Sequence, residues 1–164
     1  MYLSSEIRPG KQTLEALACF STKNKMIIDS TVLSPEQKLL INKYVGKPFS
    51  VFNLLKIGAI GSRRMIVDEY SDGFSRFLER SADLNYCNIE LRPSGIILHI
   101  AKDRSRFSWI IPYYRLVIFD SKTFSIHSEG HFLKIRRDNH YMDNKKFMDK
   151  MLILKQKATA NSFR

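Results

Sequence analysis

The chain has 164 residues, of which 44% are hydrophobic and 26% are charged, with a formal net charge of +11 and a pI of about 9.8. This composition excludes an intrinsically disordered chain and fits one globular domain with an added segment. The sequence contains neither an apolar run of about 18 residues, which a membrane-spanning helix needs, nor the basic and apolar regions of a signal peptide. We therefore expect a cytoplasmic protein.

The excess positive charge indicates an anionic partner, which is nucleic acid, an anionic membrane surface or an acidic protein. A basic surface that only maintains solubility is the alternative. Residues 86–137 are the densest in excess charge, because they hold nine Lys and Arg against four Asp and Glu. Cys19 and Cys87 are far apart and form no C-x-x-C motif, so we predict no disulfide framework and expect neither a resident metal nor a cofactor.

The clearest signal in the first half of the chain is a helix start at Ser34. Ser34 suits the N-cap, Pro35 the first helical position and Gln37 the third, which together complete a capping box. We expect this helix to end near Val45, because glycine is favoured directly after a helix and Gly46 follows.

Four other stretches before residue 85 allow more than one interpretation. Residues 12–20 fit a short helix, and residues 26–28 fit a short strand or an apolar anchor. Residues 48–70 are apolar enough to be buried and fit a helix from about Ser50, although two glycines weaken a helix there. Residues 74–84 lead into the first clear strand and are a candidate for a further strand.

Those two glycines, Gly58 and Gly61, raise the alternative of a phosphate-binding loop, since Ser62-Arg63-Arg64 follows them. The stretch lacks the GxxxxGK[ST] motif and its strand–loop–helix context. We interpret the glycines as small residues that let another part of the backbone approach closely.

The second half of the chain predicts antiparallel strands. Polar and apolar residues alternate over residues 88–91, and Arg92-Pro93-Ser94-Gly95 forms a turn in which proline presets φ. Residues 96–101 return as the partner strand. Further strands are predicted over residues 107–111, 113–119 (after a break at Pro112), 124–127 and 131–136. A helix from about Asn144 follows, because apolar residues recur at helical spacing at Phe147, Met148, Met151, Leu152 and Leu154.

Two of these patterns resemble those of bacterial pleckstrin-homology-like (PH-like) barrel domains. One is the hairpin Ile89-Glu90-Leu91-Arg92-Pro93-Ser94-Gly95-Ile96, with a glycine after its turn. The other is Trp109-Ile110-Ile111-Pro112-Tyr113-Tyr114-Arg115-Leu116, a strand that enters a bend. The resemblance covers about residues 86–155. It implies antiparallel strands with one open end of the barrel filled by the C-terminal helix.

We therefore predict an α+β fold. It consists of an antiparallel PH-like β-barrel or sandwich that is capped by the C-terminal helix and extended by an N-terminal helical segment. In this scheme residues 1–73 form the helical segment and pack on the barrel. Residues 74–156 form the barrel with its helix, and residues 157–164 form a polar tail.

Histidines provide the main case for an enzyme. His127 and His131 flank a turn, and with His99 they are a candidate three-histidine zinc site. Histidines at the mouth of a hairpin are more often solvated or hydrogen-bonded to neighbours, and neither paired carboxylates nor a nucleophile motif accompanies them. We predict no catalytic residue and no metal site, with a small hydrolase or metal-dependent enzyme as the alternative.

Basic residues after the first hairpin are the best candidates for binding an anionic ligand. Lys102, Arg104 and Arg106 alternate, so in an extended loop they point the same way. Arg136 and Arg137 add to the basic surface. Eukaryotic PH domains bind phosphoinositide headgroups with cations near the first hairpin, whereas this loop follows the second strand.

We predict a non-enzymatic module that binds a protein, a peptide or an anionic ligand. The alternative is nucleic-acid or anionic-membrane binding through the basic surface. Tyr113-Tyr114-Arg115 and the group Arg136, Arg137, His140 and Tyr141 favour nucleic acid, because aromatic residues beside cations are typical of base stacking combined with phosphate contacts.

Overall fold

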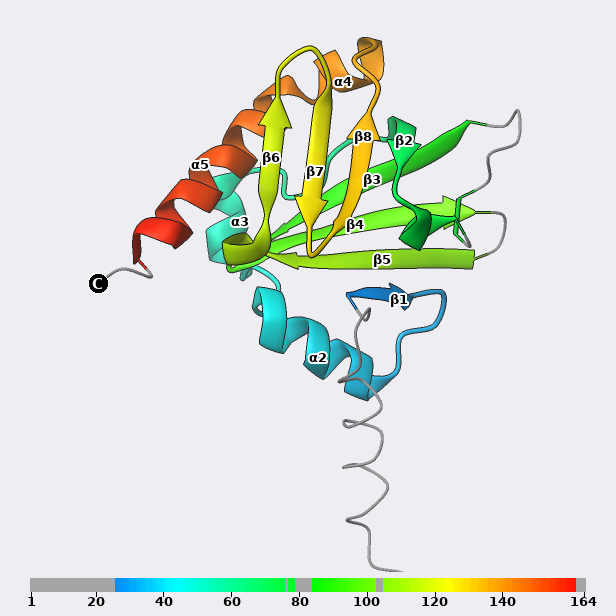
Figure 1. Cartoon of the computed structure of the whole chain (residues 1–164). Coiled ribbons are helices and arrows are strands. Elements are labelled where there is room, and N and C mark those ends of the chain that lie inside the picture. Colours follow the sequence, from blue (N-terminus) through cyan, green and yellow to red (C-terminus); the bar gives the residue numbers. More distant parts are fainter. Residues whose placement is uncertain (1–25, 76, 79–83, 103–104, 162–164) are drawn as a thin grey trace, which may run out of the picture.

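The computed structural model describes residues 26–75, 77–78, 84–102 and 105–161. They form one eight-stranded antiparallel sheet with four α-helices and two short 3-10 helices (Figure 1). The strands are β1 (Ile27–Asp29), β2 (Met65–Tyr70), β3 (Asn85–Arg92), β4 (Gly95–Lys102), β5 (Ser105–Pro112), β6 (Val117–Asp120), β7 (Phe124–Ser128) and β8 (His131–Ile135). The helices are α2 (Pro35–Val45), α3 (Val51–Ile57), α4 (Asn139–Asp143), α5 (Lys145–Asn161), η1 (Asp72–Phe74) and η2 (Tyr113–Arg115).

The sheet has the strand order β1-β5-β4-β3-β2-β8-β7-β6, and within the described residues its edge strands β1 and β6 do not pair with each other. The sheet is therefore not closed by hydrogen bonds. Strand β2 joins its two halves, because it pairs with β3 on one side and with β8 on the other. A register shift between Val67 and Glu69 bends β2. In Figure 1, β6–β8 run crosswise to β3–β5 as a result.

The main core lies between these two halves. In β3–β5 every second residue faces inward and is buried, and β7 and β8 contribute buried residues from the other half. The helix α5 adds its apolar face to the same core. Inward-facing core residues include Ile89, Leu91, Ile96, Leu98, Ile100, Trp109, Ile111, Phe124, Ile126, Leu133, Ile135, Phe147, Met148 and Met151. The prediction of a C-terminal helix that buries Phe147, Met148 and Met151 is confirmed.

A second, smaller core lies on the outer face of the same strands. Here α2 packs Ile41 and Val45 against Ile28, Ile97 and Ile110. The capping box that starts α2 is confirmed: the Gln37 backbone N–H donates to Ser34 Oγ over 3.2 Å, and the Ser34 N–H donates to Gln37 Oε1 over 2.9 Å. The helix ends at Gly46, whose φ of 86° favours glycine.

Gly95 brings this helix close to the β3–β4 hairpin. A Cβ atom at Gly95 would lie 2.4 Å from the Ile111 carbonyl oxygen and 2.6 Å from Val45 Cγ1. These distances are shorter than any relaxed contact, so only glycine fits between β5 and α2 at this point. The two-residue turn Pro93-Ser94 that leads into Gly95 occurs where the sequence predicts it.

The structure corrects several sequence predictions. Residues 65–70 are a central strand, so the sheet begins before the predicted boundary at residue 74. Residues 74–84 supply no strand where they are described; η1 ends at Phe74 and a turn follows. Residues 113–115 form η2, so the strand expected from 113 starts at Val117. The expected tail is helical as far as Asn161.

The error at residues 65–70 arises because a short apolar run has no decisive period. The helix expected from about Ser50 does form as α3, and residues 27–29 form the short strand β1. The predicted helix over residues 12–20 lies outside the described residues. Within the described part of the chain, no helix has the length and apolar character needed to cross a bilayer.

Candidate anion-binding site

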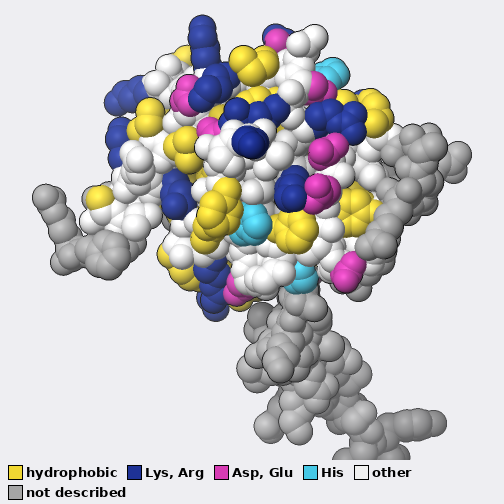
Figure 2. Space-filling model, turned by 45° about the horizontal axis from the view of Figure 1, so that its top comes forward, with side chains coloured by type: hydrophobic (Ala, Val, Ile, Leu, Met, Phe, Trp, Pro, Cys, Tyr) yellow, Lys and Arg dark blue, Asp and Glu magenta, His cyan; other side chains and the backbone are white. Residues whose placement is uncertain are grey.

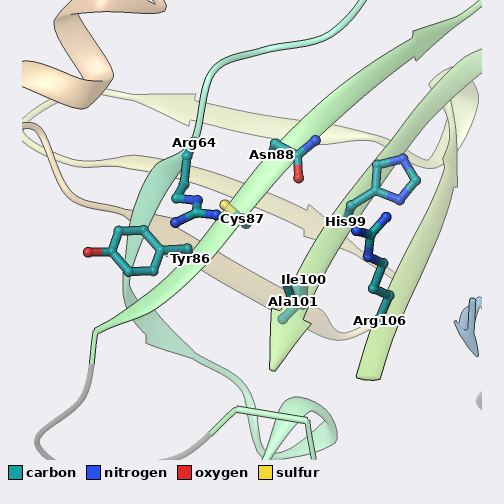
Figure 3. A pocket seen from close by; sticks show the side chains of 8 residues that line it. All are labelled: Arg64, Tyr86, Cys87, Asn88, His99, Ile100, Ala101 and Arg106. Carbon is teal, nitrogen blue, oxygen red and sulfur yellow. The ribbon is translucent and has the colours of Figure 1, made fainter. Parts of the chain in front are cut away.

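A recess of about 410 Å³ opens on the outer face of β3 and β4, at the opposite end of these strands from the contact with α2. It is lined mainly by polar and basic side chains of β3, β4 and β5, and by one residue that precedes β2 (Figure 3). The lining residues are Arg64, Tyr86, Cys87, Asn88, His99, Ile100, Ala101 and Arg106. We refer to this site as the basic recess.

Two arginines give the basic recess its charge. Figure 3 shows Arg64 and Arg106 on opposite sides, with Tyr86 beside Arg64 and His99 beside Arg106. The Arg64 guanidinium carbon lies 5.0 Å from the centroid of the Tyr86 ring, a cation–π contact that orients it. Both arginines are exposed, and among the described residues neither forms an ion pair.

A row of hydrogen-bonded polar side chains crosses the sheet beside the recess. Arg92 Nε donates to Glu90 Oε1 over 2.6 Å, and Glu90 Oε2 lies 3.1 Å from His99 Nε2. His99 Nδ1 lies 2.9 Å from Ser108 Oγ, which donates to Ser30 Oγ over 2.7 Å. This row, from Arg92 to Ser30, links β3, β4 and β5 to the residue that follows β1.

Glu90 carries the one carboxylate of this row. Burial by itself raises the pKa of Glu90, but the hydrogen bond to His99 and the charge and hydrogen bond of Arg92 outweigh it, so the pKa lies below its usual range. Glu90 is therefore ionised at neutral pH, and Arg92 balances its charge. The net positive charge of the recess then comes from Arg64 and Arg106.

One of these two arginines, Arg106, is also an anion-binding candidate in the sequence. Arg106 lines the basic recess as a predicted anion-binding residue, but the side chain of Lys102 and all of Arg104 lie outside the described residues. In the sequence, Arg64 stands out only through the alternative of a phosphate-binding loop. Its place in the recess depends on the pairing of β2 with β3, where Ile66 lies opposite Tyr86. No local sequence signal reveals that pairing.

Arg136 and Arg137 do not line the recess. Arg136 donates to Asp68 over 2.9 and 3.0 Å, and Arg137 is paired with Asp120. Figure 2 shows similar mixing on a wider scale: Asp and Glu side chains lie among the Lys and Arg side chains of the visible face. Other ion pairs are Arg63–Asp143, Arg115–Glu129, Lys134–Glu69 and Lys145–Asp149.

Comparisons with known proteins give no match: no family model, no curated protein and no solved structure matches this chain. The basic recess is the strongest candidate site because, among the described residues, no carboxylate pairs with either of its two arginines.

The side chains of Ser108, His99 and Glu90 contact one another in the order serine–histidine–carboxylate, as in a hydrolase triad. The sequence did not reveal this arrangement. However, Ser108 is only 2% exposed and its hydroxyl donates to Ser30. It lies in the middle of β5, opposite His99 of β4 on one side and Ile28 of β1 on the other. A nucleophile must reach the substrate with oxyanion donors nearby, and a serine enclosed between two strands does not meet this requirement.

The three histidines of the candidate zinc site are not brought together. His99 contacts Glu90 and Ser108, whereas His127 lies between the rings of Phe119 and Phe132. Burial and the charge of Lys134 lower the pKa of His127. His131 lies opposite Ser128 rather than His127. The part of the chain that the structure describes contains no cluster of three or more metal-binding side chains.

Two other sequence hypotheses can be placed in the structure. Gly58 ends α3 and Gly61 pairs with Glu90 of β3, so these glycines lie between a helix and a backbone pairing rather than after a strand. Tyr113 and Tyr141 are 3% and 1% exposed, so they are core residues and not stacking platforms. Tyr114 is exposed beside Arg115.

Cys87 has an apolar role. It is 2% exposed, and burial raises the pKa of its thiol to about 12. At neutral pH it therefore stays protonated and behaves as a small hydrophobic residue.

Proposed function

We propose that this chain is a non-catalytic binding module whose basic recess holds a phosphate or carboxylate group of a protein or peptide ligand. The observation that carries the proposal is the pair Arg64 and Arg106, which face one recess from two sides without a carboxylate partner in the described part of the chain. The guanidinium group offers parallel N–H donors that match the oxygens of phosphate and carboxylate.

The surroundings of the two arginines support an anionic ligand. Asn88 adds a hydrogen-bonding amide group to the recess, and Tyr86 holds Arg64 in place. Arg64 is therefore partly oriented before a ligand arrives, which lowers the entropy cost of binding. The remaining lining is small or apolar, so the recess accepts one anionic group together with part of the chain that carries it.

We also propose that residues 65–161 form a PH-like domain. Seven strands, β2–β8, in two crosswise halves and a C-terminal helix packed against their shared core support this assignment. The edge strands of the sheet stay unpaired with each other, so the proposed domain is a curled sheet rather than a hydrogen-bonded barrel.

The test is to measure binding of a fluorescent phosphoserine peptide, its unphosphorylated form and a short oligo(dT). Arg64→Ala/Arg106→Ala should weaken phosphopeptide binding by about tenfold or more, because hydrogen bonds to charged groups contribute about 1.5–3 kcal/mol each. Arg136→Ala/Arg137→Ala is the matched control, since it removes the same charge from ion-paired positions. Equal losses for both pairs would mean that only net charge matters. Preference for oligo(dT) would favour the nucleic-acid alternative.

A second candidate function is peptide binding along β6. This strand pairs only with β7 in the described part of the chain, and Val117 and Phe119 are 48% and 55% exposed. A groove of about 330 Å³ lies between η2 and α5, lined in part by Tyr113. The Tyr113 hydroxyl is buried and has no hydrogen-bond partner in that part, although buried polar groups are normally paired.

A bound peptide that extends the sheet at β6 would pair with its free edge, as in other cases of strand addition. A peptide carbonyl in the groove would supply the partner for Tyr113. Tyr113→Phe should then weaken binding of a peptide ligand without changing the thermal unfolding temperature. Arg64→Ala/Arg106→Ala, which lies elsewhere, separates this site from the basic recess.

A further inference from the structure

The helix α3 presents an apolar surface that is largely exposed in the described part of the chain. Val51, Phe52 and Leu55 are 72%, 80% and 81% exposed, and no residue of the helix is buried. Positions 51, 52 and 55 are spaced as neighbours on one side of a helix. Isolated exposed apolar residues are common, whereas a contiguous exposed patch indicates an interaction site. We call these three residues the α3 patch.

Local caps define both ends of α3, and the segment that follows the helix attaches it to the rest of the fold. Ser50 caps the start, because its hydroxyl accepts from the Asn53 N–H over 3.5 Å, and Gly58 ends the helix with a φ of 74°. Beyond it, Lys150 of α5 donates to the Ala59 carbonyl over 2.9 Å. The Ile60 carbonyl then accepts from the Leu91 N–H of β3 over 2.7 Å. The helix is therefore anchored while its apolar side chains face solvent.

The charge around the patch points to an anionic partner. Residues 37–67 contain no Asp or Glu but six cations, which are Lys38, Lys43, Lys47, Lys56, Arg63 and Arg64. Arg63 is paired with Asp143 and Arg64 lines the basic recess, so Lys47 and Lys56 are the cations that the α3 patch can use. Lys47 precedes α3 and Lys56 lies within it, and both are exposed. Elsewhere on the molecule many cations are paired with carboxylates. The apolar patch thus lies in the longest stretch of the chain that carries positive charge alone.

We propose that α3 docks this chain on an anionic lipid bilayer. Val51, Phe52 and Leu55 would enter the boundary between headgroups and acyl chains, while Lys47 and Lys56 contact anionic headgroups. A bilayer receives apolar side chains without a complementary groove, and lysines extend their charged ends to the headgroups. A seven-residue helix, about 10 Å long, is short for filling a protein groove.

A second copy of the chain fits this surface poorly. An isologous dimer contact would place each set of cations against the same set on its partner, and like charges repel each other. Three apolar side chains are also fewer than the roughly 20 residues a side of a stable interface.

The α3 patch and the basic recess lie towards opposite ends of β3, since Leu91 contacts the segment after α3 and Tyr86 lines the recess. The two proposals are therefore independent.

Vesicle sedimentation of the full chain tests the proposal. At low salt the wild type should bind phosphatidylcholine vesicles containing about 30% phosphatidylserine and bind pure phosphatidylcholine vesicles weakly, because each lysine near an anionic surface adds attraction. Phe52→Ser/Leu55→Ser should lower the partition coefficient by about tenfold or more, because the apolar surface entering the bilayer is lost. Lys47→Gln/Lys56→Gln should lower it less and should reduce its salt dependence.

Val32→Ser/Met142→Ser is the matched control, because it also removes two exposed apolar side chains, from positions outside α3. It should bind vesicles as the wild type does. Phe52→Trp provides a direct signal, since its emission should shift to the blue on anionic vesicles, whereas the native Trp109 is already buried.

Three results would overturn the proposal. The first is no binding of the wild type to anionic vesicles at low salt, and the second is equal loss of binding in the α3 and control variants. The third is a wild-type dimer in light scattering that Phe52→Ser/Leu55→Ser converts to a monomer, which would assign the patch to a second copy.

Discussion

The inner and outer faces of strands β3, β4 and β5 differ in what they contact. The inner face is apolar and buried along the length of the three strands, where it meets β7, β8 and α5. The outer face is divided: α2 covers one part, a polar row crosses the middle, and the basic recess opens at the other end. The same strands therefore provide stability through one face and a candidate site through the other. If this division is correct, substitutions should become less destabilising from the inner core outwards.

The largest effect is expected inside the core. Met151→Asp would place a charge at a side chain that is 0% exposed among apolar residues. We expect a loss of roughly 4 kcal/mol or more in the free energy of unfolding, because an unpaired buried charge is among the most costly substitutions. Chemical denaturation monitored by Trp109 fluorescence measures it. A denaturation midpoint of Met151→Asp equal to that of the wild type would show that α5 does not pack on the sheet in solution.

A smaller effect is expected where α2 packs on the outer face. Gly95→Ala would bring a methyl group into collision with the Ile111 carbonyl and with Val45. We expect a cost of about 1–3 kcal/mol, since the helix must shift outward to relieve this overpacking. Gly61→Ala is the matched control, because a Cβ at Gly61 meets no atom within 4 Å. Equal unfolding temperatures for the two variants would contradict the close approach of α2.

The sequence identified the local features of this arrangement and missed the long-range ones. The hairpin over residues 85–102 and the cap at Ser34 could be predicted, because alternation and capping depend on residues a few positions apart. Strand β2 could not, because a short apolar run such as Met65-Ile66-Val67 fits a helix or a buried strand equally well. Its identity depends on pairing with β3 and with β8, which lies more than 60 residues later.

The same limit applies to the site. Lys and Arg can be counted in a sequence, but their availability depends on partners that are distant in the chain. Arg136 is paired with Asp68, and Arg137 with Asp120. Arg106 has no such partner among the described residues. It lies across the recess from Arg64 only because the pairing of the strands brings the two residues to the same site. A basic cluster in the sequence is therefore a weaker indication of an anion site than unpaired cations that face one recess.

The polar row should contribute less stability than the inner core, and its contribution should depend on pH. Glu90→Gln leaves the largely buried Arg92 without its charged partner, so we expect a loss of about 2 kcal/mol in the free energy of unfolding at neutral pH. In the wild type the interactions with His99 and Arg92 that lower the pKa of Glu90 stabilise the fold while the carboxylate is ionised. That contribution is present at neutral pH and is lost in acid as the pH falls through the folded-state pKa.

The difference between wild type and Glu90→Gln should therefore narrow as the pH falls below the usual carboxylate range. Urea denaturation at a series of pH values measures it. A difference that stays constant into the acid range would show that Glu90 acts through packing rather than through its charge.

The smallest effect on stability is expected in the basic recess. Its arginines are exposed, in contrast to the buried side chains of the inner face. Arg64 and Arg106 are exposed, and within the described residues no carboxylate pairs with them. Replacing both with Ala should change the free energy of unfolding by less than about 0.5 kcal/mol, as for most surface substitutions. Removing the repulsion between these two cations favours a slight increase in the free energy of unfolding. This increase should become smaller at high salt, because salt screens the charges. Thermal unfolding of the double variant at low and high salt measures both quantities. A loss of stability as large as that of Glu90→Gln would mean that the two arginines hold the sheet together, and the recess would then belong to the scaffold rather than to a binding site.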